Sequence, residues 1–196
     1  KDKKLLNIIN QKFLLYPAQF WSHKNHKYLV EALSILKEKH NIKIKIIFCG
    51  KDKGNLEFVK KLVSEKNLDD EVYFVDFVSE EEMVLLYKKC LALVMPTYVA
   101  RSTLPLYEAF CFKVPVFYSK GILDKSLEKF VVTFDLNDFA SLATKLKEFV
   151  NNEINLSENI NNANKYFLEK CNKEKLSENY TKILNEYKFL KSIWKN

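Results

Sequence analysis

A serine-threonine pair followed by a proline and, about one helical turn later, a glutamate is the part of this chain best suited to chemistry. The segment Ser102-Thr-Leu-Pro-Leu-Tyr-Glu108 follows an apolar run at 91–95. Because a helix N-terminus offers unpaired N–H groups, Ser102, Thr103 and Leu104 form a candidate diphosphate cradle. Glu108 is then placed to accept hydrogen bonds from a ribose diol. The alternative is structural: Ser102 and Thr103 cap the helix, and Glu108 is solvated.

A lysine at the expected start of another helix is the second candidate. Lys24 lies in the segment Phe20-Trp-Ser-His-Lys-Asn-His26, after a short apolar run at 13–18. A cation at a helix N-terminus is unfavourable by a few tenths of a kcal/mol, and an anionic ligand would reverse this. Lys24 is therefore a candidate phosphate ligand or a flexible surface lysine. His23 and His26 do not predict a metal site, because no carboxylate or cysteine completes one.

Alternating apolar strands and amphipathic helices position these residues. The expected strands are 13–18, 43–49, 72–75, 91–95, 114–118 and 130–134. Each crossover between parallel strands needs a covering element, so the pattern predicts an α/β fold, a Rossmann-like parallel six-stranded sheet with helices on both faces. Ligands bind beyond the carboxyl ends of such strands. The loops expected to line that edge are 18–24, 50–54, 76–79 and 96–103. Ser79, with Glu82 three residues later, predicts a capping box that opens a helix through Lys89.

The chain divides into a Rossmann-like domain at 1–150 and a carboxyl-terminal helical extension at 151–196. Apolar residues alternate with lysines near the end, as in Tyr187-Lys-Phe-Leu-Lys191 and Ile193-Trp-Lys195. This pattern suits docking of the extension onto the same domain or a partner domain, or contact with an anionic membrane surface.

Composition narrows the function classes. The 196 residues carry a formal net charge of +7, but lysines are mixed with glutamates along most expected helices. This mixing indicates a solvated basic surface rather than a nucleic-acid site. Four cysteines without a CxxC pair predict reduced thiols and a cytoplasmic location. No apolar run approaches the roughly 20 residues of a membrane span.

Together these motifs resemble the carboxyl-terminal half of glycosyltransferase family 4, the retaining nucleotide-sugar transferases of the two-domain GT-B fold. The resemblance covers about residues 13–150. It rests on segments in matching order, which are Tyr16-Pro-Ala-Gln-Phe-Trp-Ser-His-Lys-Asn-His26 with Leu29-Val-Glu-Ala-Leu33, Phe48-Cys-Gly50, Val72-Tyr-Phe74 with Phe77-Val-Ser79, and Leu93-Val-Met-Pro-Thr97 through Pro105-Leu-Tyr-Glu-Ala-Phe110.

The resemblance implies roles for particular residues. In the family a basic pair after the first strand binds the donor diphosphate. Lys24 falls on the lysine position, and Gln19 stands where the family usually has arginine. Ala100 stands where the first glutamate of a paired-glutamate motif is usual, and Arg101 is a candidate replacement for the missing cation. The implied donor-binding set is Gln19, Lys24, Phe77, Val78, Arg101, Ser102, Thr103, Leu104 and Glu108, of which Lys24 and Glu108 are catalytic.

The implied function is transfer of a hexosyl group, with retention, from a UDP- or GDP-linked sugar to a glycan or lipid-linked acceptor. The family resemblance implies no tightly bound cofactor, no required metal, and an acceptor held by a missing amino-terminal domain, so the isolated chain should be inactive. Surface-polysaccharide biosynthesis is the expected setting, in the cytoplasm or peripherally on the inner face of the membrane. Two rivals remain: a non-catalytic regulatory or interaction module on the same sheet, and a nucleic-acid binder.

Overall fold

The computed structural model describes residues 8–99 and 103–194, and these residues form a parallel α/β sheet with helices on both faces. Its strands are β1 (Phe13–Pro17), β2 (Lys45–Cys49), β3 (Val72–Val75), β4 (Ala92–Met95), β5 (Val116–Ser119) and β6 (Val132–Phe134). Their order is β3-β2-β1-β4-β5-β6, and every pairing is parallel. The predicted six-stranded Rossmann-like sheet is confirmed, with strand ends that differ from the expected ones by one or two residues.

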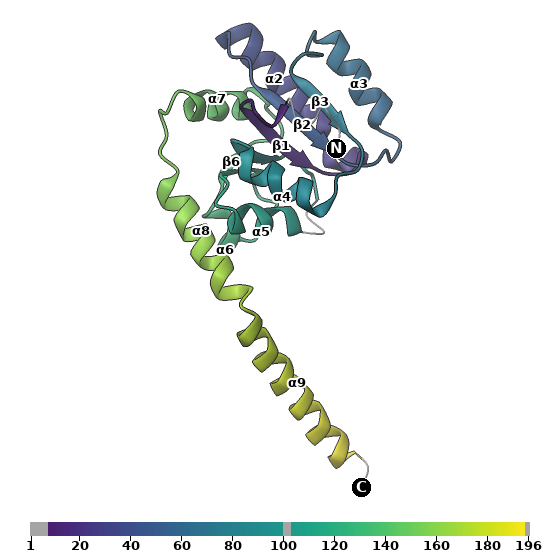
Figure 1. Ribbon diagram of the computed structural model, residues 1–196, viewed down its shortest axis with the longest axis vertical. Helices are drawn as coiled ribbons and strands as arrows, with labels where there is room; N and C mark the ends of the chain where they lie inside the picture. The colour runs from purple at the N-terminus through teal and green to yellow at the C-terminus, as the bar shows by residue number, and fades with distance from the viewer. Residues whose placement is uncertain (1–7, 100–102, 195–196) are drawn as a thin grey trace.

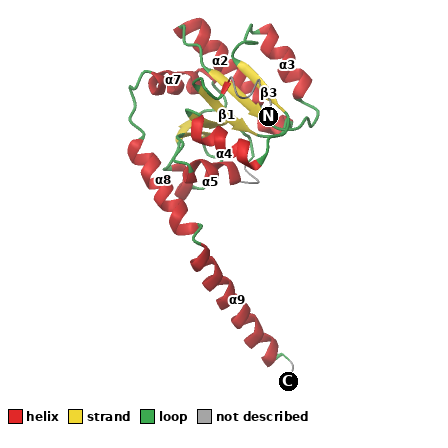
Figure 2. Ribbon diagram, in the orientation of Figure 1, coloured by secondary structure: helices red, strands yellow, loops and turns green. Residues whose placement is uncertain are grey.

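Helices cover both faces of this sheet, as Figures 1 and 2 show. One face carries α2 (His26–His40), α3 (Leu56–Glu65) and α7 (Phe139–Val150). The opposite face carries α4 (Glu80–Lys89) and α5 (Leu104–Cys111), with the short α6 (Lys125–Glu128) beside them. A sheet covered in this way buries both sides of each strand, which explains why the strands are continuous apolar runs rather than alternating ones.

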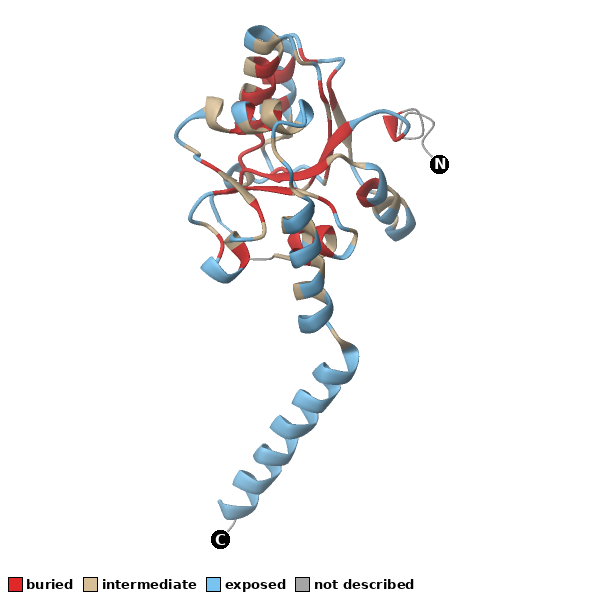
Figure 3. Cartoon of the chain, turned by 90° about the vertical axis from the view of Figure 1, so that its left-hand side faces the viewer, coloured by how far each residue is buried: buried red, intermediate tan, exposed pale blue. Residues whose placement is uncertain are grey.

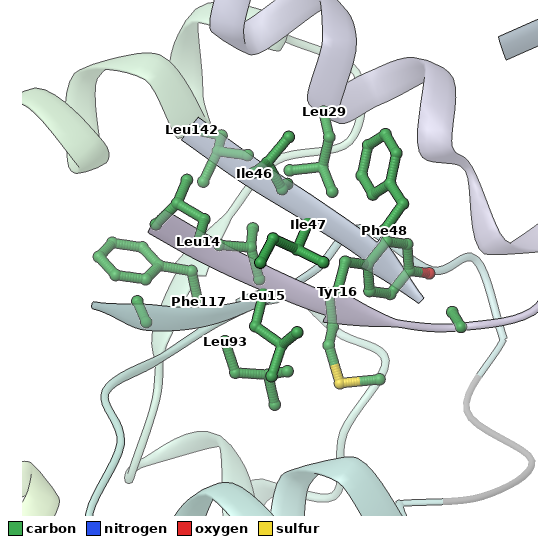
Figure 4. Close-up of a cluster of buried hydrophobic side chains, with 14 of the residues drawn as sticks. Leu14, Leu15, Tyr16, Leu29, Ile46, Ile47, Phe48, Leu93, Phe117 and Leu142 are labelled. Carbon is green, nitrogen blue, oxygen red and sulfur yellow. The ribbon is translucent and has the colours of Figure 1, made fainter. Parts of the chain in front are cut away.

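The core lies on both sides of the central strands (Figure 4). Leu14 and Ile46 point towards Leu29 of α2 and Leu142 of α7, whereas Leu15 points to the opposite face. All five side chains have no exposed surface. The sheet therefore holds its carboxyl edge rigidly from both faces.

Side chains cap two of the helices that follow strands, α4 and α3. Ser79 and Glu82 form the capping box expected before α4: the Ser79 Oγ accepts from the Glu82 N–H, and the Glu82 Oε2 accepts from the Ser79 N–H. Before α3, the Asp52 Oδ1 accepts hydrogen bonds from three successive backbone N–H groups, those of residues 54, 55 and 56. These caps fix where two helices begin at the carboxyl edge.

Two further helices form most of the carboxyl-terminal extension. The first, α8 (Ser157–Lys170), packs on α5, and the Asn164 Nδ2 donates to the Phe110 carbonyl oxygen at 2.9 Å. The second, α9 (Lys173–Ile193), has no buried residue. It extends away from the sheet along its whole length (Figures 1 and 3).

Gly50 permits a close approach between the loops that follow β1 and β2. A Cβ at this position would lie 2.6 Å from the Ala18 carbonyl carbon and 2.7 Å from the Gln19 nitrogen. We expect Gly50→Ala to lower the free energy of unfolding by about 2 kcal/mol, because backbone atoms must move to relieve the overlap. Urea denaturation measures this loss. The control Lys51→Ala, at an exposed neighbour, should change the free energy little, and an equal effect of both variants would contradict the steric argument.

Candidate functional site

A cavity of about 850 Å³ opens at the carboxyl ends of β1 and β4. The chain leaves β1 towards α2 on one face of the sheet and leaves β4 towards α5 on the other (Figure 1). When neighbouring strands are followed by connections to opposite faces, a crevice forms at the carboxyl edge, and this crevice is the usual ligand site of open parallel sheets. The cavity is lined by Pro17, Ala18, Gln19, Trp21, His23, Lys24, Met95, Val99, Leu104 and Pro105.

Hydrogen bonds join the two walls of this cavity. The Tyr98 N–H, after β4, donates to the His23 carbonyl oxygen, after β1, at 3.0 Å. The Thr97 Oγ1 also lies 3.3 Å from the His23 carbonyl oxygen. The same Oγ1 lies 2.8 Å from the Val99 carbonyl oxygen, and the Ser119 Oγ donates to the Thr97 carbonyl oxygen at 2.7 Å, which holds Thr97 in place. Thr97 and Tyr98 therefore hold the β1–α2 and β4–α5 connections together.

Lys24 is one of the predicted residues that line the cavity. It ends a 3-10 turn (Ser22–Lys24) just before α2, and its carbonyl oxygen accepts a hydrogen bond of 2.6 Å from the Tyr16 hydroxyl. The side chain is half-buried, and burial lowers the pKa of its ammonium group. Among the described residues, no acidic side chain forms an ion pair with it. A half-buried charge without a counterion favours an anionic ligand.

Gln19 lines the same cavity, and a neighbouring tryptophan orients its amide. The Trp21 Nε1–H donates to the Gln19 Oε1 at 3.1 Å. The Gln19 carboxamide nitrogen keeps two N–H donors, since Trp21 occupies the oxygen. Lys53 places its Nζ 5.7 Å from the centroid of the Trp21 ring. Where the resemblance implies an arginine, the structure thus has a neutral donor with a cation nearby.

The amino end of α5 forms the opposite wall. Leu104 and Pro105, the first two residues of α5, line the cavity. Thr103 precedes the helix, but its side chain makes no capping hydrogen bond. The structural alternative for Thr103 is therefore not observed. The predicted ligands Arg101 and Ser102 lie outside the described residues, as does Ala100.

Glu108 lies one turn beyond Leu104 and on the same face of α5. It does not line the cavity itself. Its Oε2 accepts a hydrogen bond of 2.7 Å from the hydroxyl of Tyr87, in α4. Burial raises the pKa of Tyr87 well above its usual value, and the Glu108 carboxylate raises it further. The sequence analysis missed Tyr87, because no spacing rule relates a tyrosine in one helix to a glutamate in another.

The structure does not bring Phe77 and Val78 into this cavity. They follow β3, which is separated from β1 by β2, although all three strands end at the same edge. The Phe77 side chain is 76% exposed, and the Lys51 Nζ lies 5.9 Å from its ring centroid. Their suggested contact with a nucleobase stays a prediction.

Beneath the Lys24 loop, His26 is enclosed by aromatic rings. Its ring centroid lies 4.3 Å from that of Phe20, 4.8 Å from that of Tyr16 and 5.1 Å from that of Phe48. Burial lowers its pKa from 6.5 to about 3, and the Lys24 charge contributes to the shift. His26 is therefore a neutral, fully buried support for the loop.

Two features are absent from residues 8–99 and 103–194. No group of three or more His, Cys, Asp or Glu side chains is arranged to hold a metal ion. None of the helices in these ranges is both long enough and apolar enough to cross a membrane.

The fold is that of one half of a GT-B glycosyltransferase. Its cavity lies at the carboxyl edge, where open parallel sheets usually bind ligands. The chain belongs to the family described as glycosyl transferases group 1, whose model matches residues 1–166. The expected resemblance is thus confirmed at the level of this family.

One sequence relative and two solved structures illustrate the similarity. The O-antigen chain mannosyltransferase RfbU of Salmonella typhimurium is 28% identical over 109 residues, or 56% of this chain and 30% of RfbU. Sucrose-phosphate synthase of Thermosynechococcus elongatus aligns with a TM-score of 0.78 at 21% identity, over 94% of this chain and 48% of that chain. Anabaena Alr3699/HepE in complex with UDP and glucose aligns with a TM-score of 0.75 at 14% identity, over 94% and 51%. The chain thus spans between 30% and 51% of the length of each of these proteins.

The burial of His26 predicts a pH-dependent stability. The folded chain keeps His26 neutral down to about pH 3, whereas in the unfolded chain it binds a proton below about pH 6.5. The stability that the folded chain gains from a neutral His26 is therefore present above about pH 6.5 and is lost as the pH falls from there towards about 3. Between about pH 7.5 and about pH 5.5, wild type should lose about 1.4 kcal/mol more of its unfolding free energy than His26→Phe.

Urea denaturation at the two pH values measures this difference. The control Ile47→Val, at a buried core position, should lose about 1 kcal/mol at both pH values alike. Parallel pH dependences of wild type and His26→Phe would contradict the assignment.

Proposed function

We propose that this chain is the nucleotide-sugar donor-binding domain of a retaining glycosyltransferase of family 4. The observation that carries the proposal is Lys24, a half-buried cation without a described acidic partner, in the cavity between β1 and β4. A diphosphate supplies the negative charge that this cation lacks. The names of two similar proteins support the ligand class, since one is a mannosyltransferase and the other was solved with UDP and glucose.

Charge stabilisation is the main chemical task of such a domain. Transfer of a glycosyl group leaves negative charge on the departing diphosphate while the sugar becomes cationic. In our proposal Lys24 and the N–H groups at 102–104 stabilise this charge, with Arg101 as a second cation. Preorganised donors in a water-poor site are worth several kcal/mol in the transition state, so this mechanism requires no metal.

The remaining predicted residues hold the nucleoside in this proposal. Glu108 accepts hydrogen bonds from the ribose, and the backbone around Phe77 and Val78 contacts the base. Gln19 donates to the diphosphate through its amide N–H groups. The donor is a UDP- or GDP-linked hexose, and the acceptor is a glycan or glycolipid in surface-polysaccharide assembly.

We further propose that α9 docks on a second domain, which holds the acceptor. Six apolar residues of α9 and its C-cap form a stripe, with spacings of four and three, that runs through Leu176, Tyr180, Ile183, Tyr187, Leu190 and Trp194. Each of these six side chains is exposed, up to 87% for Trp194. Such spacing is typical of a helix that packs along a partner surface. The competing proposal is that α9 contacts the inner face of a membrane.

Nucleotide binding tests the main proposal. In a thermal-shift panel of UDP, GDP, ADP, CMP and their sugar conjugates, we expect one diphosphate class to stabilise the wild-type chain. A ligand at about 100 times its dissociation constant adds about 2.7 kcal/mol, which raises the melting temperature by several degrees. Lys24→Ala should abolish most of this shift, because it removes the charge in the cavity.

The matched control is Lys60→Ala, an exposed lysine of α3 that pairs with Glu57. It should retain the full shift. No response of the wild type to any nucleotide would favour the non-catalytic interaction module, and strongly salt-dependent binding to RNA or DNA would favour the nucleic-acid binder.

Truncation tests the role of α9. Because no residue of α9 is buried, removal of residues 173–196 should change the free energy of unfolding by no more than about 0.5 kcal/mol and leave nucleotide binding unchanged. Urea denaturation and the same thermal-shift panel provide the measurements. A loss of about 2 kcal/mol or more would instead show that α9 packs on its own domain.

A further inference from the structure

Tyr87 and Glu108 form a part-buried hydrogen bond between α4 and α5, one turn from the cavity wall. Tyr87 is 1% exposed, and its hydroxyl lies 2.7 Å from the Glu108 Oε2. Its ring stacks on Phe112, with centroids 5.7 Å apart and planes at 16°. The Pro105 carbonyl oxygen lies 3.4 Å from the same hydroxyl, too far to compete with the carboxylate. The tyrosine therefore donates its single hydroxyl hydrogen to Glu108.

This hydrogen bond occupies one of the two carboxylate oxygens of Glu108. Glu108 is half-buried in α5, and no described residue donates a hydrogen bond to its Oε1. Leu104, one turn towards the helix start and on the same face, lines the cavity. Glu108 is thus tethered through one oxygen beneath the cavity wall, and the other oxygen retains its capacity to accept.

A tether of this kind limits rotation of the carboxylate. A hydrogen bond to a charged acceptor is stronger than one between neutral groups, and the donor is fixed by its buried ring. A glutamate without it would have to lose side-chain freedom each time it bound a hydroxyl group. The geometry therefore gives Glu108 a preset orientation at no cost to the ligand.

We propose that Tyr87 is a positioning residue that orients Glu108 to accept hydrogen bonds from the ribose hydroxyls of a nucleoside diphosphate. The inference rests on the proposed function, because it assigns a partner to the ribose ligand of that same site. If Tyr87 orients Glu108 in this way, the contact between α4 and α5 makes nucleotide binding depend on the ribose 2′-hydroxyl, and the site distinguishes ribose from 2′-deoxyribose.

The test compares ribo- and deoxyribonucleotides by isothermal titration calorimetry on the 196-residue chain. The probes are UDP and GDP with their 2′-deoxy analogues. We expect the wild type to bind the preferred ribonucleotide about tenfold more tightly than its deoxy analogue. Tyr87→Phe, which keeps the buried ring, should reduce this ratio to about threefold or less by weakening the ribonucleotide alone.

Two further variants separate positioning from a structural effect. Tyr28→Phe also removes the hydroxyl of a fully buried tyrosine, but that hydroxyl donates to the carbonyl oxygens of Asp135 and Asp138. It should retain the wild-type ratio. In a Glu108→Gln background, Tyr87→Phe should cause no further loss, since the charged acceptor is already absent.

The outcomes distinguish the inference from the proposed function. An unchanged ratio in Tyr87→Phe, or an equal weakening of both nucleotides, would overturn the positioning role while leaving nucleotide binding intact. Failure of the wild type to bind any of the four probes would overturn the proposed donor site, and the inference with it.

Discussion

The candidate site depends on one constraint: after β1 and after β4 the chain continues to opposite faces of the sheet. The two strands pair in parallel, and their connections lead to opposite faces of the sheet. A cavity at that edge therefore follows from topology before any particular side chain is considered. The hydrogen bond between Tyr98 and the His23 carbonyl oxygen, together with the close approach at Gly50, then fixes the positions of the loops around it. The site is thus built by backbone geometry, which sets where its side chains lie.

Within that frame, the electrostatics of the site depend on one lysine. Burial disfavours the charged form of Lys24, and the same environment keeps His26 neutral beneath it. Two adjacent buried cations would repel each other, so the neutrality of His26 allows Lys24 to hold the charge in this loop. Gln19 adds neutral donors where the family resemblance implies an arginine, and Lys53 contributes a cation at the nearby Trp21 ring. The charge around the cavity is therefore arranged differently from the pattern that the resemblance implies.

The sequence predicted the elements better than the contacts between them. Continuous apolar runs identified the strands because both faces of the sheet are covered, and the Ser79–Glu82 spacing located the start of α4 because that cap is local. The carboxyl-edge rule also brought Gln19, Lys24 and Leu104 to one cavity. This rule does not tell which loops along that edge are neighbours, so it did not show that β2 separates Phe77 and Val78 from the cavity. The Tyr87–Glu108 pair and the aromatic enclosure of His26 join residues distant in the sequence, and no local pattern encodes such contacts.

The contrast between α8 and α9 bears on how the domain meets its surroundings. Both helices carry apolar residues, but α8 buries Ala163 against the domain and donates a hydrogen bond to the end of α5. In α9 a stripe of six large apolar side chains remains exposed over the whole helix. A helix gains most of its stability from packing of its apolar face, so the exposed stripe is the basis for the docking that we propose. Because α8, which precedes α9, packs on α5, a partner bound along α9 would be linked through α8 to the helix that carries Leu104 and Glu108.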